Sequence, residues 1–313
     1  MWGRRTRRAA LAAAAVGGGG VAAVAARLAA RRREEHWAPP ERQRSQPYLS
    51  VETLGAGDSP VILLHPLSGS AEYFGSAFDE LGDPGPLVVP DLLGFGESPR
   101  PEYGYTPDEQ VAAIARSLDG LEITSPGLWV GHGLGAILAL RAAATDPGRV
   151  RAVVAISPLL YRDDASARRR LRRLSPLQLG GPLDRNLARA IYGGSGTRSR
   201  LAGQLARLWQ VDLPGGAQSS APRPSEQAYR EILETCVFGA EAGHWFDQIT
   251  VPVHMVLPAN DPVPDPRLMR ELTERHPNVS LSVLPFGDHR LPLTQPDGCL
   301  AAIDRFRDAS GRF

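Results

Sequence analysis

Hydrophobic positions along the chain follow two alternating patterns. Short apolar runs bounded by turn-forming residues predict β-strands at 48–54, 61–64, 87–89, 128–130, 153–156, 253–257 and 279–284. Stretches with helical periodicity lie between most of them, at 71–81, 107–121, 134–145, 265–276 and 296–309. This alternation predicts an α/β fold, with a mostly parallel sheet flanked by helices. Reactive groups are then expected at the carboxyl ends of the strands.

The alternation is confined to a core of two segments, 48–159 and 247–313. Between them, residues 160–246 lack the strand pattern and predict a helical cap inserted over the strand ends. Before the core, residues 34–47 are polar and interrupted by proline, which predicts a linker. The core therefore carries the sheet, and the cap shapes any substrate pocket.

The first 33 residues have the composition of a targeting segment. Four arginines, the last two in the string Thr6-Arg7-Arg8, precede an uncharged run rich in alanine and glycine from 9 to 26. This arrangement resembles a twin-arginine export signal, for which weak hydrophobicity is suitable. Arginines after the run and the lack of a clear cleavage context leave an uncleaved membrane anchor open. We expect an exported or membrane-anchored protein that contacts the membrane through its N-terminus, with a cytoplasmic Ala-rich tail as the third alternative.

Charge and composition exclude several function classes. All 35 cationic residues are arginine, so no lysine can form a Schiff base or bind phosphate in a phosphate-binding loop. Residues 1–44 carry ten arginines against three acids and residues 160–213 carry eleven against four, whereas acids predominate elsewhere. An acidic body of this kind argues against nucleic-acid binding. The distant Cys236 and Cys299 indicate neither a disulfide framework nor a metal site, and we expect no cofactor.

Five ordered motifs carry the chemistry. Gly131-His132-Gly133-Leu134-Gly135 lies between a predicted strand and an apolar helix, the context of the G-x-S-x-G nucleophile elbow. The other four are LLHPLSGS at 63–70, PDLLGFGESPRP at 90–101, AND at 259–261 and GDH at 287–289. Over 48–309 the chain thereby resembles the cap-containing members of the α/β-hydrolase superfamily.

The resemblance implies a role for each motif. His289 would be the general base, and Asp261 would orient it and stabilise its protonated form. The backbone N–H groups of Leu67 and Leu134 would form an oxyanion hole. The departure is Gly133, which stands where the family has the serine nucleophile. Without a side chain at this position, no acyl-enzyme can form there.

Two hypotheses about function follow. In the first, His289 and Asp261 perform cofactor-independent acid–base chemistry on a small apolar carbonyl or ester compound, either a lyase-type elimination or hydrolysis by activated water. In the second, the protein is a non-catalytic relative that binds a ligand or a protein partner whose identity the sequence leaves open. A further alternative is hydrolysis through a replacement nucleophile, for which the serines by type are Ser68, Ser70, Ser98 and Ser157.

Overall fold

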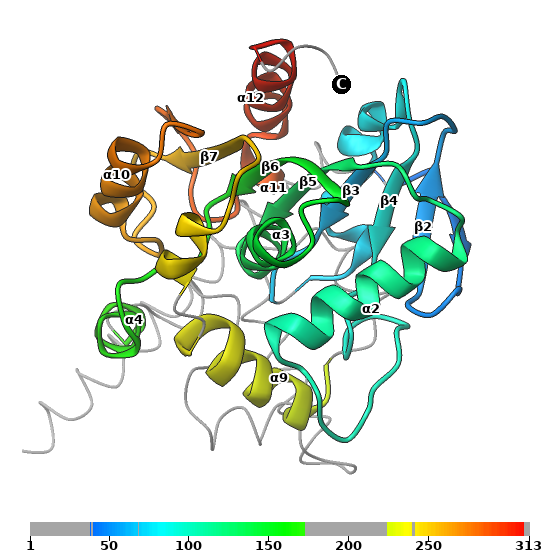
Figure 1. Cartoon of the computed structure of the whole chain (residues 1–313), viewed down its shortest axis with the longest axis horizontal. Helices are drawn as coiled ribbons and strands as arrows, with labels where there is room; N and C mark the ends of the chain where they lie inside the picture. The colour runs from blue at the N-terminus through cyan, green and yellow to red at the C-terminus, as the bar shows by residue number, and fades with distance from the viewer. Residues whose placement is uncertain (1–37, 39, 68, 173–223, 240–241, 310–313) are drawn as a thin grey trace, which may run out of the picture.

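A computed structural model describes residues 38, 40–67, 69–172, 224–239 and 242–309, and its centre is an eight-stranded β-sheet (Figure 1). In chain order the strands are β1 (Gln43–Ser45), β2 (Val51–Leu54), β3 (Val61–Leu64), β4 (Leu87–Pro90), β5 (Gly127–His132), β6 (Val150–Ile156), β7 (Val253–Pro258) and β8 (Val279–Leu284). Their order across the sheet is β1-β2-β4-β3-β5-β6-β7-β8. β2 is antiparallel to both of its neighbours, and the six remaining strands beyond it run parallel. The predicted mostly parallel sheet is confirmed.

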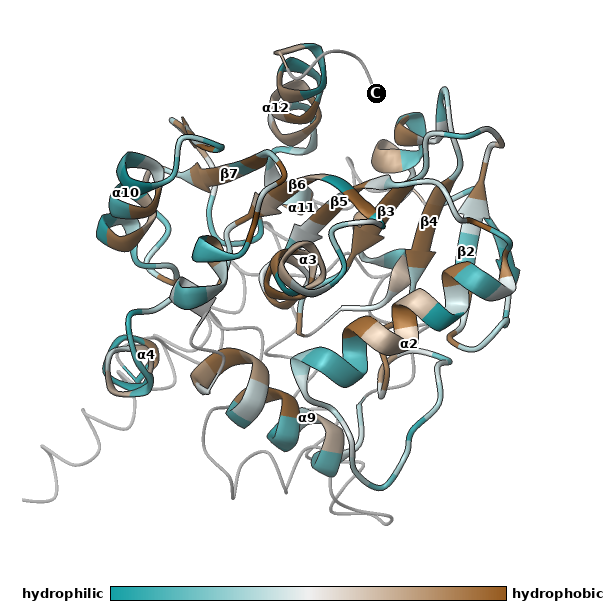
Figure 2. Ribbon diagram, in the orientation of Figure 1, coloured by the Kyte–Doolittle hydropathy of each residue, from teal (hydrophilic) through white to brown (hydrophobic). Residues whose placement is uncertain are grey.

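Helices cover both faces of the sheet. On one face lie α2 (Pro107–Gly120), α3 (Leu134–Thr145) and α10 (Pro266–Arg275), and on the other η1 (Ala71–Phe74), η2 (Ser76–Gly82), α11 (Leu291–Thr294) and α12 (Pro296–Ala309). Successive residues of a strand point to opposite faces, so Ile62 and Leu64 join the first cluster while Val61 and Leu63 join the second. Figure 2 shows the resulting hydrophobic strands between helices with polar outer surfaces.

The predicted helix 71–81 is two 3₁₀ helices instead of one continuous helix. Gly75 separates η1 from η2 with φ 60 and ψ −170. Glycine adopts positive φ without steric cost, so it permits this break in the chain direction. η1 itself directly follows the loop after β3.

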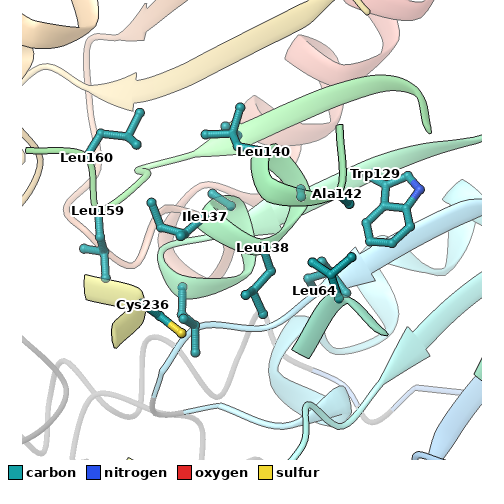
Figure 3. Packing of buried hydrophobic residues seen from close by; sticks show 14 of the residues in the cluster. Leu64, Trp129, Ile137, Leu138, Leu140, Ala142, Leu159, Leu160 and Cys236 are labelled. Carbon is teal, nitrogen blue, oxygen red and sulfur yellow. The ribbon is translucent and has the colours of Figure 1, made fainter. Parts of the chain in front are cut away.

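Helix α3 lies at the centre of the core and begins at the predicted elbow. Ile137, Leu138 and Leu140 of α3 pack with Trp129 of β5 and with Leu159 and Leu160, which follow β6 (Figure 3). Glycine is required where the start of α3 approaches β3, because a Cβ at Gly135 would lie 2.1 Å from the carbonyl oxygen of Leu64. A Cβ at Gly131 would likewise lie 2.3 Å from the carbonyl carbon of Gly135. Both glycines therefore allow the start of α3 to touch β3 and β5.

The described part of the predicted cap is helical. It comprises α4 (Asp164–Leu171), α9 (Glu226–Ile232), the π-helical segment η3 (Leu233–Phe238) and η4 (Ala242–Asp247). Apolar side chains of α9 and η3, such as Tyr229 and Phe238, join the same core cluster as α3. Residues 173–223 of the predicted cap lie outside the described residues.

The predicted linker contains a strand. Gln43, Arg44 and Ser45 form β1 and pair antiparallel with Thr53, Glu52 and Val51 of β2. The hydrophobic pattern did not predict this strand, because its three side chains are polar and exposed and lie in a proline-interrupted segment. The predicted signal or anchor at 1–33 lies outside the described residues, and none of the described helices is long and apolar enough to cross a bilayer.

Candidate active site

Gly133 occupies the sharp turn between β5 and α3. It has φ 57 and ψ −107 and forms the N-cap of α3. A Cβ at this position would lie 3.5 Å from Pro66 Cβ and 3.9 Å from His289 Nε2, both ordinary contact distances. Unlike Gly131 and Gly135, Gly133 is therefore not required by close packing. Only its left-handed backbone conformation favours glycine.

His289 and Asp261 lie together at the carboxyl ends of adjacent parallel strands. Asp261 follows β7 and His289 follows β8. The Nδ1–H group of His289 donates to Asp261 Oδ2 over 2.9 Å, and Asp261 Oδ1 accepts the backbone N–H of Val263 over 2.9 Å. The structure thus brings together the two residues to which the resemblance assigned the base and its orienting acid. Because Nδ1 carries the proton, Nε2 has a free lone pair on the side of Gly133.

The surroundings of Asp261 favour its charged form. Burial acts to raise its pKa, but the charge and hydrogen bond of His289 and the Val263 N–H outweigh burial, and the pKa lies below its ordinary value. Asp261 is therefore ionised at neutral pH. An ionised carboxylate in contact with Nδ1 stabilises the imidazolium that forms when Nε2 takes a proton.

His132 supports His289 from the elbow. Its Nε2–H donates to the carbonyl oxygen of His289 over 2.7 Å, and its ring stacks on that of Tyr73 with centroids 5.5 Å apart. Burial, followed by the charge of His289, lowers the pKa of His132 to about 3. His132 is accordingly a neutral side chain that holds the His289 backbone. Its position directly before the elbow was the available sequence signal, but the contact across 157 residues was not predictable from it.

The two predicted oxyanion-hole residues follow neighbouring strands. The register Leu64↔Gly131 places the ends of β3 and β5 side by side, and Leu67 and Leu134 come shortly after these ends. As the first residue of α3, Leu134 has an N–H without an acceptor inside the helix. The N–H of Leu134 is thus adjacent to Gly133 in the chain, and the loop with Leu67 begins at the neighbouring strand end, so the oxyanion hole stays a prediction.

A buried histidine fixes the loop that carries Leu67. The Nδ1–H of His65 donates to the Pro66 carbonyl over 2.8 Å, and Nε2 accepts the N–H of Leu92 over 3.0 Å. Burial lowers the pKa of His65, so the ring is neutral. The loop after β3 is thereby tied to the 90–101 motif.

The serines considered as replacement nucleophiles are not positioned as partners of His289. The Ser98 hydroxyl donates to the Asp91 carbonyl over 2.6 Å and accepts the Ser50 N–H over 2.9 Å, which is a structural role. Ser157 directly follows β6 in a left-handed conformation with φ 43, and its hydroxyl helps to lower the pKa of Asp261. No hydrogen bond joins Ser70, Ser98 or Ser157 to His289 among the described residues, and Ser68 lies outside them. Within the described part of the chain, no cluster of side chains could hold a metal ion.

Sequence relatives of this chain are hydrolytic enzymes. The chain is 31% identical to a haloalkane dehalogenase from Agrobacterium fabrum over 118 residues, which span 37% of this chain and 38% of the dehalogenase. It is 24% identical over 269 residues to 2-(acetamidomethylene)succinate hydrolase from Mesorhizobium japonicum, covering 83% of this chain and 92% of that enzyme. The first match spans less than half of its relative, whereas the second is nearly complete.

Solved structures share the fold at low sequence identity. The crystal structure of E-2-(acetamidomethylene)succinate hydrolase matches with a TM-score of 0.65 and 22% identity, covering 85% of this chain and 98% of that one. An esterase from Thermogutta terrifontis matches with a TM-score of 0.61 and 19% identity, covering 86% and 99%. The alpha/beta hydrolase family model matches residues 61–302, which include the elbow, Asp261 and His289. With that match and the sheet, elbow and loop positions described above, the chain belongs to the alpha/beta hydrolase family.

Proposed function

We propose that this protein catalyses acid–base chemistry with His289 and Asp261 and forms no acyl-enzyme. The observation that carries the proposal is that the Nε2 atom of His289 points toward Gly133. Its Nε2 lies 3.9 Å from where a Cβ of residue 133 would be, and no described residue forms a hydrogen bond with it. Gly133 takes the position of the family nucleophile, so the base faces a place where a side chain is missing.

The missing hydroxymethyl group leaves room for a water molecule or a substrate atom. In hydrolysis, Nε2 removes a proton from a water that attacks the substrate carbonyl. In elimination, Nε2 removes a proton from the carbon beside a carbonyl, a carbon–carbon double bond forms, and the group on the next carbon leaves with the electron pair of its bond. In both reactions Asp261 stabilises the imidazolium, and the N–H groups of Leu67 and Leu134 stabilise the developing oxyanion. The same residues therefore support either outcome.

We infer that the substrate is a small apolar carbonyl or ester compound. The named relatives support a small molecule, since one is a dehalogenase for haloalkanes and one a hydrolase for a substituted succinate. Apolar cap residues that pack toward α3, among them Val237 and Phe238, support an apolar environment. The proposal needs no cofactor.

We also propose that residues 1–33 direct export or anchor the protein to a membrane. The proposal is supported by the basic head of this segment and by the uncharged Ala- and Gly-rich run that follows it. Mass measurement of exported and membrane fractions tests the point. Loss of about 30 residues would indicate a cleaved signal, an intact chain in membranes an anchor, and an intact soluble chain would contradict both.

The catalytic proposal is tested with a panel of esters and carbonyl metabolites. His289→Ala should abolish the turnover that the natural protein shows, while its thermal midpoint stays within a few degrees. His244→Ala is the matched control, because His244 is exposed on η4. The product mass distinguishes the reactions, since hydrolysis adds one water and elimination adds none. Unchanged turnover in His289→Ala contradicts the proposal, and ligand binding without turnover by the natural protein favours the non-catalytic alternative.

A further inference from the structure

Helix α4 of the cap touches the loop that carries Asp261. Arg170 Nε donates to the carbonyl oxygens of Pro262 and Val263 over 3.0 and 3.1 Å. The buried Tyr161 hydroxyl donates to the same Val263 carbonyl over 3.0 Å. The segment just before and within α4, which Figure 1 draws in green below α10, is thus bonded to the loop between β7 and α10.

These contacts continue to the carboxylate. The N–H of Val263 donates to Asp261 Oδ1, while Oδ2 accepts from His289. Val263 is fully buried, so its peptide groups have no water to replace lost partners. Rotation of the 262–263 peptide would move the N–H that orients Asp261. Holding the two carbonyls therefore holds the carboxylate against His289.

Arg170 is suited to this role by its shape and by its helix. A guanidinium is rigid and planar, so one N–H can serve two adjacent carbonyls in a defined direction, unlike a flexible ammonium. Its helix is held from another side by Arg168, which pairs with Glu234 and lies 4.0 Å over the Phe238 ring of η3. Of Arg168, Arg169 and Arg170, only Arg169 is exposed. The other two therefore make contacts inside the protein.

We propose that Arg170 is a positioning residue that fixes the Asp261 carboxylate against His289 through the carbonyls of Pro262 and Val263. Cap helix α4 thereby sets the alignment of the base with the position of Gly133. Its effect on catalysis rests on the proposed function, but its effect on the His289 to Asp261 contact does not. Arg170 contacts no reacting atom in this scheme.

The test compares Arg170→Met with Arg169→Met, a change of the exposed neighbour on the same helix. The first readout is the proton NMR signal of the His289 Nδ1–H, assigned by its loss in His289→Gln. In the natural protein and in Arg169→Met, the hydrogen bond to Asp261 should keep this signal far downfield. In Arg170→Met it should move upfield or broaden. Arg170→Gln is measured with the same expectation if Arg170→Met does not fold.

The second readout adds a serine at the elbow. In the Gly133→Ser background, Arg170→Met should slow fluorophosphonate labelling about tenfold, because a misplaced orienting group costs rate steeply. Arg169→Met in that background should leave the labelling rate unchanged. A folded Arg170→Met variant with an unchanged NMR signal and labelling rate overturns the proposal. Absence of any natural substrate, with the NMR shift observed, would refute the proposed function and leave the role of Arg170 intact.

Discussion

Gly133 lies at a position where the backbone conformation favours glycine but the surrounding atoms leave room for a side chain. Its φ of 57 costs a residue with a side chain about 1 to 3 kcal/mol, whereas glycine adopts it freely. Gly131 and Gly135 are different, because a Cβ on either would overlap backbone atoms. The elbow therefore has two glycines that packing requires and a third, Gly133, that only its backbone conformation favours.

Gly133→Ser should restore a nucleophile. The added Cβ meets Pro66 and His289 at ordinary distances, so the variant should fold and lose about 1 to 3 kcal/mol of unfolding free energy. Gly133→Ala carries the same backbone cost without a hydroxyl and is the matched control. Fluorophosphonate should label Gly133→Ser and neither Gly133→Ala nor the natural protein. Labelling of the natural protein would reveal another activated serine, and a folded but unlabelled Gly133→Ser variant would contradict the proposed alignment of His289.

At the scale of elements, the segment that leads into β1 is bonded to the short helices beside the site. Arg42, just before β1, has a side chain that is 0% exposed and donates to Asp79 over 2.6 Å. It also donates to the carbonyls of Ala71 and Gly75 over 3.1 and 2.8 Å. Through Arg42, the segment just before β1 thus holds η1 and η2 in place. η1 in turn directly follows the loop with Leu67.

Arg42→Ala should strongly destabilise the fold. The change removes the guanidinium that pairs with Asp79 and Glu52 and donates to two carbonyls, and removal of one member of a buried ion pair costs about 3 to 5 kcal/mol. Urea unfolding of the natural and variant proteins measures the loss. Arg162→Ala removes an exposed pair with Glu271 and should change the midpoint little. Equal urea midpoints for all three proteins would mean that the Arg42 contacts contribute nothing to the stability of the fold.

Across the whole molecule, buried neutral histidines couple stability to pH. Burial lowers the pKa of His65, of His132 to about 3 and of His254 to about 4. The unfolded chain binds protons at these positions near pH 6.5, whereas the folded protein does not, so stability falls as the pH drops below 6.5. Asp261 has a lowered pKa and loses its stabilising effect only at lower pH, as the pH falls through that value.

His132→Gln should reduce this sensitivity. Between pH 7 and 5 the natural protein should lose about 2 kcal/mol through His132 alone, because the folded state keeps the ring neutral while the unfolded chain protonates it. The variant lacks the titrating group and should lose correspondingly less over the same range, although it is less stable at pH 7 through poorer packing. Denaturant unfolding at pH 7 and 5 measures both. An identical pH dependence in the two proteins would contradict a neutral buried His132.

The sequence by itself determined seven of the eight strands, the order of the loops and the chemistry present in them. Strand and helix periods arise from neighbouring residues, so 61–64 and 296–309 were predicted at the bounds observed. Through their resemblance to a known family, the AND and GDH motifs likewise predicted that Asp261 would orient His289. Only the tertiary structure decided that β1 joins the sheet, that His289 Nε2 lies toward Gly133 and that Arg170 bonds to a loop 92 residues away. Such contacts depend on how distant elements pack, and no local pattern of residues records that packing.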